Sequence, residues 1–327
     1  MEQEPANPEQ SSQVKKGLRE DILGDSHPVR STLNLIERAI KVPNMNVSLH
    51  GEPGTGKKLV AKTIHENSPR REHPFISINI NAIAENELET VLFGTEQGAF
   101  PEALMTTKGK LKEAGEGTLF IDEVSDIAPE QQISLLAMLQ GKKPKEGGDQ
   151  DAFPVGCRII TATNGDLLQA VRNNTFREDL YYHLVGLPIT LPPLRERGED
   201  ILLLANHFLN VFCRTNNLPQ MHLSPQAEEK LLRHTYPGNI RELKAIVELG
   251  AVLSNDNTIH ECQIVFDHLS FRPVVLDREL TLKEYNEQII LHFMKKYHSV
   301  KEVASRLDIG KSTIYNLLKK HNNHDAD

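Results

Sequence analysis

The segment GEPGTGKK, residues 51–58, constrains the fold more than any other part of the chain. It follows the apolar run VSLH at 47–50 and precedes the helical pattern LVAKTIHEN at 59–67. Glycines let a backbone curl so that its N–H groups face a phosphate, and the helix that follows adds the positive end of its dipole. A strand, such a loop and a helix in this order predict a nucleotide site in an α/β fold. The residues expected to form it are Gly51, Glu52, Pro53, Gly54, Thr55, Gly56, Lys57 and Lys58.

The loop ends in two lysines, which differ in what they contribute. Lys57 is expected to reach the outer phosphates. The common pattern continues with Ser or Thr, whose hydroxyl binds Mg²⁺, but this chain has Lys58 there. A glycine-rich turn without a ligand is the alternative reading. The order of strand, glycines, lysine and helix favours the phosphate site.

Two further strand-like segments end in polar side chains. GTLFIDEVSD, at 117–126, ends its apolar run at Asp122 and Glu123, and RIITAT, at 158–163, is followed by Asn164. Asp122 can hold Mg²⁺, and Glu123 can orient a water molecule for attack on the γ-phosphate of ATP. Ligands of open α/β sheets bind at the carboxyl edge of the strands. We therefore expect these side chains to meet the phosphate loop at that edge.

The hydrophobic pattern changes along the 327 residues. Strand-like runs alternate with helical patterns in the first half, which predicts a parallel sheet covered by helices. Apolar spacings of three and four then predict helices alone. The expected organisation is a disordered N-terminus at 1–20, an α/β nucleotide-binding part at 21–190, a helical part at 191–265, a linker at 266–280 and a C-terminal helical domain at 281–327.

Composition limits the location and the partners of the chain. It is 39% hydrophobic and 25% charged, has three scattered cysteines, and contains no apolar run of 18 residues. These features predict a cytoplasmic protein without disulfides, without a zinc site and without a membrane segment. The net charge of −8 does not suggest that the chain as a whole binds nucleic acid.

The motifs resemble those of one family, the AAA+ activators of the enhancer-dependent sigma-54 RNA polymerase. The similarity runs from about Leu23 to Lys320 and includes GEPGTGK, GTLFIDE, ATN, FREDLYY, LPPLRER and YPGNIRELK, in the order typical of the family. The resemblance implies an AAA+ fold with a helical lid and a C-terminal helix-turn-helix domain of the Fis type. It also implies ATP and Mg²⁺ as cofactors, and a ring of subunits in which each site is completed by its neighbour.

The resemblance assigns roles to four further polar side chains. Asn79 looks like the residue that holds Glu123 until the nucleotide changes state, and Asn164 looks like the first sensor of that state. Arg241 looks like the second sensor, which contacts the nucleotide from the lid. Arg177 looks like one of two arginines that act near the γ-phosphate at the subunit boundary, where a planar, permanently charged group suits the transition state.

The chain departs from the family pattern in three places. The family usually has Glu where this chain has Lys58, and its second boundary arginine is His183, which is shorter and mostly neutral at pH 7. The loop that touches the sigma factor usually reads Gly-Ala-Phe-Thr-Gly-Ala. In this chain Pro101 and Glu102 replace the threonine and the glycine of that pattern. Proline fixes φ and removes a backbone hydrogen-bond donor, and a glutamate charge is costly in a partly buried contact. The loop residues of this chain are Gly98, Ala99, Phe100, Pro101, Glu102 and Ala103.

A basic segment lies near the C-terminus. Residues 295–320 hold seven Lys and Arg residues against two acidic residues, so the segment carries a net charge of +5. The pattern at 299–321 predicts two short helices joined by a tight turn, and such a module inserts its second helix into the major groove of DNA. The helix before it could form a dimer seam, and a small helical packing domain is the alternative. The expected DNA contacts are Lys311, Ser312, Thr313, Tyr315, Asn316 and Lys319.

Three functions remain open from the sequence. The first is an ATP-binding, DNA-binding regulator that remodels sigma-54 polymerase. The second is a regulator of the same fold with an impaired ATPase and no sigma contact, acting as a repressor, by another contact, or on an intact relative. The third is an AAA+ ATPase with a client outside transcription. The basic C-terminal module disfavours the third, and the altered loop favours the second over the first in mechanism.

Overall fold

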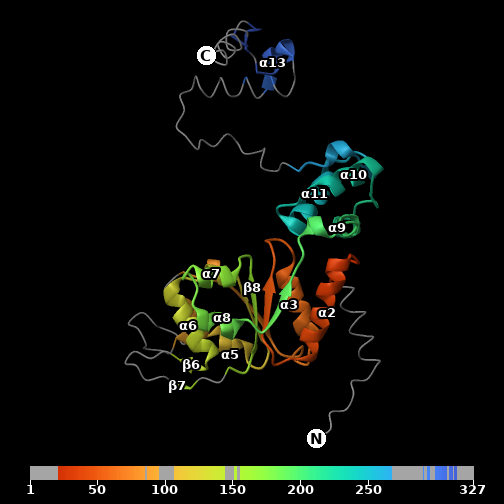
Figure 1. Ribbon diagram of the computed structural model, residues 1–327. Helices are drawn as coiled ribbons and strands as arrows, with labels where there is room; N and C mark the ends of the chain where they lie inside the picture. Colours follow the sequence, from red (N-terminus) through yellow and green to blue (C-terminus); the bar gives the residue numbers. More distant parts are fainter. Residues whose placement is uncertain are drawn as a thin grey trace, which may run out of the picture. The chain divides into compact units, whose positions relative to one another are not determined.

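The computed structural model describes residues 21–84, 87–95, 107–143, 151–152 and 155–266, together with parts of 290–314. The chain divides into two units, Met1–Phe266 and Asp267–Asp327, and each is described by itself (Figure 1). The expected N-terminal segment 1–20 and most of the expected linker lie outside the described residues. Among the helices of the described residues, none has the length and apolar character that crossing a bilayer requires.

A five-stranded parallel sheet forms the centre of the first unit. Its strand order is β2-β5-β8-β1-β9, so that β8 lies between β1, the strand before the phosphate loop, and β5, the strand that ends at Asp122. The strands of the sheet are nearly free of charge and largely buried, as is typical of a sheet covered on both faces. Their bounds are β1 Val47–His50, β2 Phe75–Asn79, β5 Thr118–Asp122, β8 Arg158–Thr163 and β9 Leu187–Thr190.

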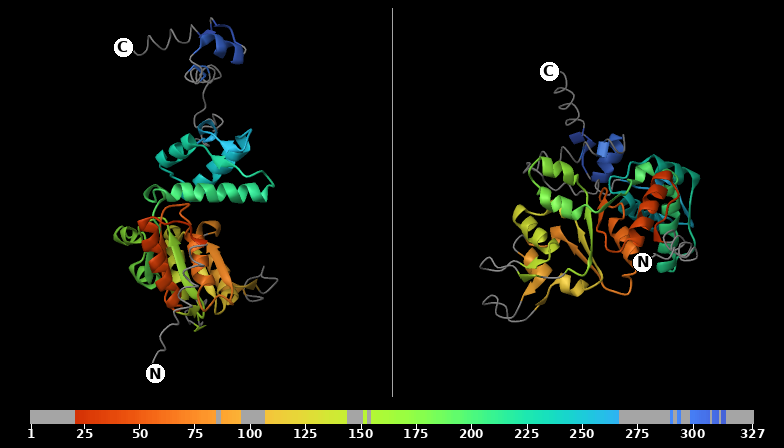
Figure 2. Two further views of the ribbon diagram at one scale, coloured as in Figure 1. Left: turned by 90° about the vertical axis from the view of Figure 1, so that its right-hand side faces the viewer. Right: turned by 60° about the horizontal axis from the view of Figure 1, so that its bottom comes forward.

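Helices cover both faces of the sheet (Figure 2). Alternate strand residues belong to different cores. Leu119 and Ile159 pack in one cluster, whereas Phe120 and Ile160 pack in the other, with α2 and α3. The period of two in the strands thus supplies one apolar surface to each layer. The helices are α2 His27–Lys41, α3 Lys57–Glu66, α4 Leu88–Phe93, α5 Lys110–Ala114, α6 Pro129–Leu139, α7 Leu167–Arg172 and α8 Glu178–Leu184.

A helical part follows the sheet and has its own core. The left-hand view of Figure 2 shows its longest helix, α9, crossing over the α/β part. Leu204, Leu231, Tyr236 and Leu243 are buried within it, and the Tyr236 hydroxyl donates to the Leu231 carbonyl oxygen at 2.7 Å. Its elements are η3 Leu194–Glu196, α9 Asp200–Thr215, β10 His222–Leu223, α10 Pro225–Arg233, α11 Asn239–Leu253, β11 Thr258–Ile259 and η4 Glu261–Gln263.

Two short antiparallel pairs flank parts of the chain that lie outside the described residues. β3, Gly94–Thr95, pairs with β4, Thr107–Lys108, so the chain leaves and returns at one place. β6, Lys142–Lys143, pairs with β7, Asp151–Ala152, in the same way. The residues expected to contact the sigma factor, 98–103, lie between β3 and β4 and outside the described residues.

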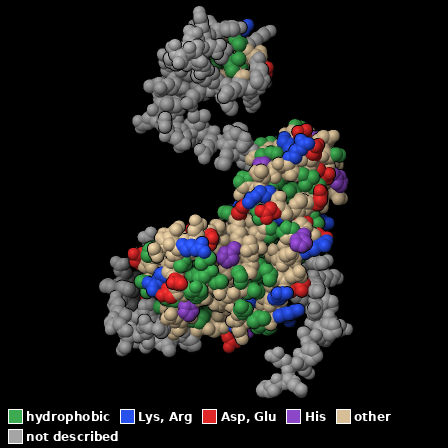
Figure 3. Space-filling model, viewed as in Figure 1, with side chains coloured by type: hydrophobic (Ala, Val, Ile, Leu, Met, Phe, Trp, Pro, Cys, Tyr) green, Lys and Arg blue, Asp and Glu red, His purple; other side chains and the backbone are tan. Residues whose placement is uncertain are grey.

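The second unit is described only in part. Its helix α13, Val300–Leu307, packs through Val303 and Ala304 against Ile290 and Ile314. Of the side chains expected to contact DNA, Lys311 and Thr313 are exposed, and the other four lie outside the described residues. On the face of the first unit that Figure 3 shows, basic and acidic side chains are interspersed, so this face offers no extended basic surface for a DNA backbone.

Candidate nucleotide site

Three neighbouring strands deliver the predicted side chains to one edge of the sheet. β1 runs into the phosphate loop, β5 ends at Asp122 and β8 ends at Thr163. β5 and β1 each pair in parallel with β8, so their carboxyl ends meet. The phosphate loop, Glu123 and Asn164 therefore lie together, as strand ends of a parallel sheet require.

Lys57 is held inside this cluster by neutral oxygens. Its ammonium donates to the backbone oxygens of Gly51, at 2.7 Å, and Glu52, at 3.2 Å, and to the side-chain oxygen of Asn164. Lys57 is buried, and this burial lowers the pKa of its ammonium, although the carboxylates of Glu123 and Asp122 raise it. A buried cation with neutral partners is suited to exchange them for a phosphate.

Asn164 connects the lysine to the predicted water-orienting carboxylate. Its amide nitrogen donates to the carboxylate of Glu123, while its oxygen accepts from Lys57. Glu123 has φ 58° and ψ 43°, a left-handed conformation that is unusual for a residue other than glycine, and its N–H donates to Asp122 Oδ1 at 3.1 Å. Such strain persists where the surrounding structure fixes it, and it is common in active sites.

Asn79 occupies the neighbouring strand end but makes a different contact. It is paired in register with Asp122, and its side-chain oxygen accepts from the N–H of Asn81 at 2.9 Å, which caps the short helix η1, Ile80–Ala82. The amide that donates to Glu123 in this structure is that of Asn164. The switching role that the resemblance gives to Asn79 stays a prediction.

Glu52 belongs to the phosphate loop through its backbone, but its side chain contacts the helical part that follows the sheet, from η3 to η4, which is called the lid from here on. Arg195 donates to both carboxylate oxygens, at 2.9 and 2.6 Å, and Asn239 donates to one of them at 3.0 Å. The hydrogen bonds from Arg195 and Asn239 lower the pKa of Glu52 to about 2. The carboxylate is therefore ionised at neutral pH and ties the loop to the lid.

Arg241, the predicted second sensor, lies over the phosphate loop. It is exposed in the first turn of α11, and a Cβ atom added to Gly54 would lie 3.3 Å from its Cβ. Its positive charge also lowers the pKa of Lys57. The lid therefore places a second cation close to the lysine, as the contact with a nucleotide phosphate would require.

Arg177 and His183 lie on α8 and its start, with other partners. Arg177 pairs with Asp179 through two hydrogen bonds, at 3.0 and 2.7 Å, and both side chains are nearly half exposed. His183 is exposed, and its backbone oxygen accepts from the Asn46 amide at 3.3 Å. Within the described part of the chain, no hydrogen bond joins Arg177 or His183 to the cluster of Lys57, Asn164 and Glu123.

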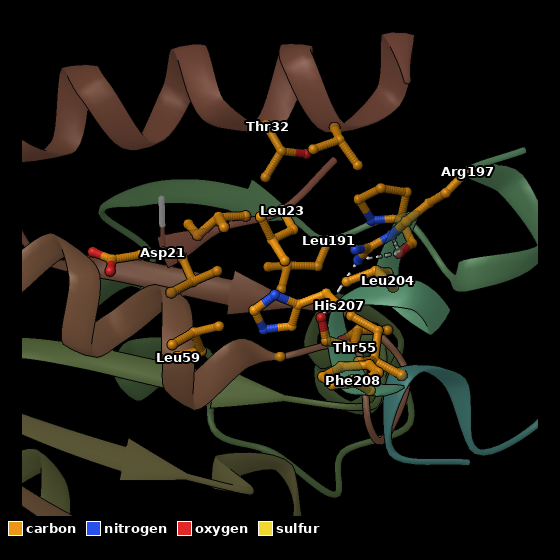
Figure 4. A pocket seen from close by; sticks show the side chains of 16 residues that line it. Asp21, Leu23, Thr32, Thr55, Leu59, Leu191, Arg197, Leu204, His207 and Phe208 are labelled. Carbon is orange, nitrogen blue, oxygen red and sulfur yellow. Dashed lines mark hydrogen bonds between the residues drawn. The ribbon is translucent and has the colours of Figure 1, made fainter. Parts of the chain in front are cut away.

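A cavity of about 130 Å³, which was not predicted from the sequence, adjoins the phosphate loop (Figure 4). Thr55 and Gly56 of the phosphate loop and His207 and Phe208 of α9 are among the residues that line it. A mostly apolar slot beside a phosphate loop suits a flat heterocyclic base. Its apolar lining consists of Ile22, Leu23, Val29, Leu59, Val60, Leu191, Pro192, Leu204, Phe208 and Ile240.

Comparison with known families agrees with this geometry. Residues 22–190 match the family model described as Sigma-54 interaction domain. The chain belongs to this family. Residues 195–272 match the AAA+ ATPase lid domain, so the resemblance stated from the motifs is confirmed.

Individual relatives are longer than this chain. The nitrogen fixation protein AnfA of Azotobacter vinelandii is 40% identical over 256 residues, which cover 77% of this chain and 48% of that protein. VnfA of the same organism is 36% identical over 311 residues, 92% of this chain and 59% of that one. The transcriptional regulatory protein ZraR of Escherichia coli K12 is 38% identical over 291 residues, 88% and 66%. The chain thus spans about half to two thirds of these relatives.

Solved structures show the same fold. NtrX from Brucella abortus in complex with ATP superimposes with a TM-score of 0.70 at 27% identity, covering 95% of this chain and 73% of that one. The Hsp104–ADP complex of S. cerevisiae gives a TM-score of 0.52 at 16% identity, which shows the fold alone. The predicted α/β class with a parallel sheet of the AAA+ type is confirmed.

Proposed function

We propose that the chain is an ATP-binding and DNA-binding transcriptional regulator that acts with sigma-54 RNA polymerase. The observation that carries the proposal is the cluster of Lys57, Asn164 and Glu123 at the sheet edge, beside a slot that suits a base. The similarity to ZraR and to ATP-bound NtrX supports the same function. The relatives do not favour a client outside transcription.

The residues present fit a magnesium ion held mainly by the nucleotide. Asp122 is the carboxylate at the strand end, and its Oδ1 accepts from the Glu123 N–H at 3.1 Å. The described residues contain no group of three or more His, Cys, Asp or Glu side chains suited to a metal. Mg²⁺ commonly takes one or two carboxylates plus phosphate oxygens and water, and it neutralises phosphate charge. We assign Asp122 as its protein ligand, with no hydroxyl from position 58.

The polar cluster suggests how binding and hydrolysis are linked. When phosphates enter, Lys57 exchanges the Asn164 oxygen for phosphate oxygens, which are stronger acceptors because they are charged. Asn164 is then free to reorient, and Glu123 loses the amide that holds it. Glu123 can next accept a hydrogen bond from a water molecule and orient it toward the γ-phosphate. In this proposal Asn164 and Arg241 are the first and second sensors of the nucleotide state, and Asn79 holds Glu123 until that state changes.

Hydrolysis also needs positive charge from a neighbouring subunit. Arg177 is the candidate, since its side chain is nearly half exposed and takes part in a surface pair with Asp179. His183 stands where the family has a second arginine, so we propose that the chain turns ATP over slowly. An assembly that binds ATP tightly and hydrolyses it slowly suits a regulator that senses nucleotide.

The remaining parts of the proposal concern partners. In this proposal residues 281–327 form a helix-turn-helix domain that binds double-stranded DNA as a dimer, and the exposed side chains of Lys311 and Thr313 are compatible with such a contact. The ATP-binding units form a ring in the cytoplasm. Pro101 and Glu102 weaken the contact with sigma-54, and in that case the protein would act as a repressor, by another contact, or through an intact relative.

One experiment tests the central claim. Purified protein is titrated with a fluorescent ATP analogue in the presence of Mg²⁺, beside the variant Lys57→Ala and the control Lys62→Ala, whose lysine forms a surface pair with Glu66. We expect Lys57→Ala alone to lose binding. Open-complex formation by sigma-54 polymerase with ATP is then measured. Absence of nucleotide binding by the unaltered chain would overturn the proposal.

A further inference from the structure

The backbone oxygens of the phosphate loop all have hydrogen-bond partners, and several partners come from the lid. The Lys57 ammonium donates to the backbone oxygens of residues 51 and 52. Groups of the lid donate to the backbone oxygens of residues 53, 54 and 55. The Asn239 amide donates to Pro53 O at 3.0 Å, the backbone N–H of residue 240 donates to the oxygen of residue 54 at 3.0 Å, and Arg197 donates to the oxygen of residue 55 at 3.4 Å.

These contacts determine the direction of the loop's N–H groups. In a trans peptide bond the C=O and the next N–H point in opposite directions, and the chain has no cis peptide bond among the described residues. When the Pro53 oxygen faces the lid, the Gly54 N–H faces away from it, toward the phosphate side. Likewise, when the Thr55 oxygen faces Arg197, the Gly56 N–H faces away from the lid. The lid therefore orients the donors that would bind a phosphate.

Asn239 is the side chain most completely committed to this arrangement. It is fully buried, and its φ of 53° lies in the left-handed region that asparagine tolerates better than most residues. Its oxygen accepts from the Leu194 N–H at 2.8 Å, and its nitrogen donates to Pro53 O and to the Glu52 carboxylate, both at 3.0 Å. The amide thus joins two lid segments to the phosphate loop at one point.

We propose that Asn239 is a positioning residue for phosphate binding. It holds the Pro53 carbonyl toward the lid, so that the Gly54 N–H is available to the phosphates of the nucleotide. This inference rests on the proposed function, because it concerns the same ATP site. Since coupling between two equilibria is reciprocal, lid docking favours phosphate binding and bound phosphate favours lid docking.

The substitution Asn239→Asp separates positioning from folding. The new carboxylate is the same size and still accepts from the Leu194 N–H, but it has no donor for Pro53 O and it repels the Glu52 carboxylate. We expect affinity for ATP and ADP to fall about tenfold or more, since a lost hydrogen bond to a charged group and a new repulsion act together. Affinity for adenosine, which lacks phosphates, should stay within twofold.

Matched variants keep the test decisive. Asn216→Asp changes the same residue type at an exposed position at the end of α9, where the amide donates only to Phe212 O, and should bind ATP normally. Glu52→Gln in the Asn239→Asp background removes the repulsion and should restore part of the ATP affinity. If Asn239→Asp does not fold, Asn239→Gly is used instead, because glycine accepts the positive φ and still removes the amide.

The measurements are a titration with fluorescent ATP and ADP analogues, ligand-observed NMR with adenosine, and the unfolding midpoint without nucleotide. A selective loss of ATP and ADP affinity supports the proposal. ATP affinity within twofold of the unaltered chain, or an equal loss for adenosine, would overturn it. If the unaltered chain binds no nucleotide, the proposed function itself is wrong.

Discussion

Gly54 and Gly56 form a natural pair for testing how closely the lid and the phosphate loop are packed. Both have a positive φ, 80° and 98°, so alanine at either position costs about 1–2 kcal/mol in left-handed strain. They differ in their surroundings. A Cβ at Gly54 would lie 2.2 Å from the Gly238 carbonyl oxygen, whereas a Cβ at Gly56 would meet nothing within 4 Å.

The additional cost at Gly54 can be estimated from these contacts. A carbon and an oxygen at 2.2 Å must separate by about 1 Å or more to reach ordinary contact, which costs about 1–3 kcal/mol in a packed region. The same shift disturbs the hydrogen bond from the Ile240 N–H to Gly54 O, worth about 0.5–1.5 kcal/mol. Gly54→Ala should therefore destabilise the nucleotide-free protein by about 2–4 kcal/mol more than Gly56→Ala.

The assay is thermal unfolding of both variants without nucleotide, so that phosphate contacts do not contribute. For a unit of this size, 1 kcal/mol shifts the midpoint by about 2–4 °C, so a difference of about 4 °C or more is expected. Limited proteolysis shows whether the lid separates first. Equal midpoints for Gly54→Ala and Gly56→Ala would refute the reasoning, because strain alone would then explain both.

Four other predictions concern other parts of the chain. His183→Arg should raise the steady-state rate of phosphate release at saturating ATP, and no gain would count against slow turnover by the native chain. The paired change Pro101→Thr with Glu102→Gly should increase transcription from sigma-54 polymerase; strong activation by the native chain, with no gain from the change, would show that the interpretation of this loop is wrong. Deletion of 281–327 should abolish DNA binding, and retained binding would contradict the assignment of that segment. Burial lowers the pKa of His50 below its ordinary value of 6.5. The unfolded chain therefore binds more protons at this residue, and the stability of the fold should decrease as pH falls below about 6.5. A pH series of unfolding midpoints checks this, and His50→Gln should flatten the pH dependence.

The sequence was sufficient for the parts of the site that one strand or loop determines. Strand ends of a parallel sheet share an edge, so the positions of Lys57, Glu123 and Asn164 could be predicted from three short motifs. It was insufficient to show whether Asn79 or Asn164 donates to Glu123. Both are asparagines at strand ends, and the choice depends on side-chain rotamers set by the three-dimensional packing.

The lid contacts and the cavity were beyond sequence reasoning for a different reason. Asn239 reaches Pro53 across 186 positions of the chain, and no local pattern marks such a pair. The cavity is lined by segments far apart in the sequence, from Asp21 to Ile240, and no local pattern shows that they meet beside the phosphate loop. Glu52 illustrates the limit most clearly, because its place in the motif suggests phosphate binding while its carboxylate is paired with Arg195.

The position of Asn164 between Lys57 and Glu123 has a consequence for how readily ATP can enter. A direct ion pair between the lysine and the glutamate would be strong in a partly buried site, and breaking it would leave two uncompensated charges. The neutral amide accepts from the cation and donates to the anion, so each charge is satisfied without being locked to the other. Incoming phosphate then replaces a neutral acceptor on Lys57, which costs less than replacing a carboxylate. In the function proposed above, the same event would free the amide that holds Glu123, so that arrival of the phosphate would both fill the site and prepare the carboxylate for its water molecule.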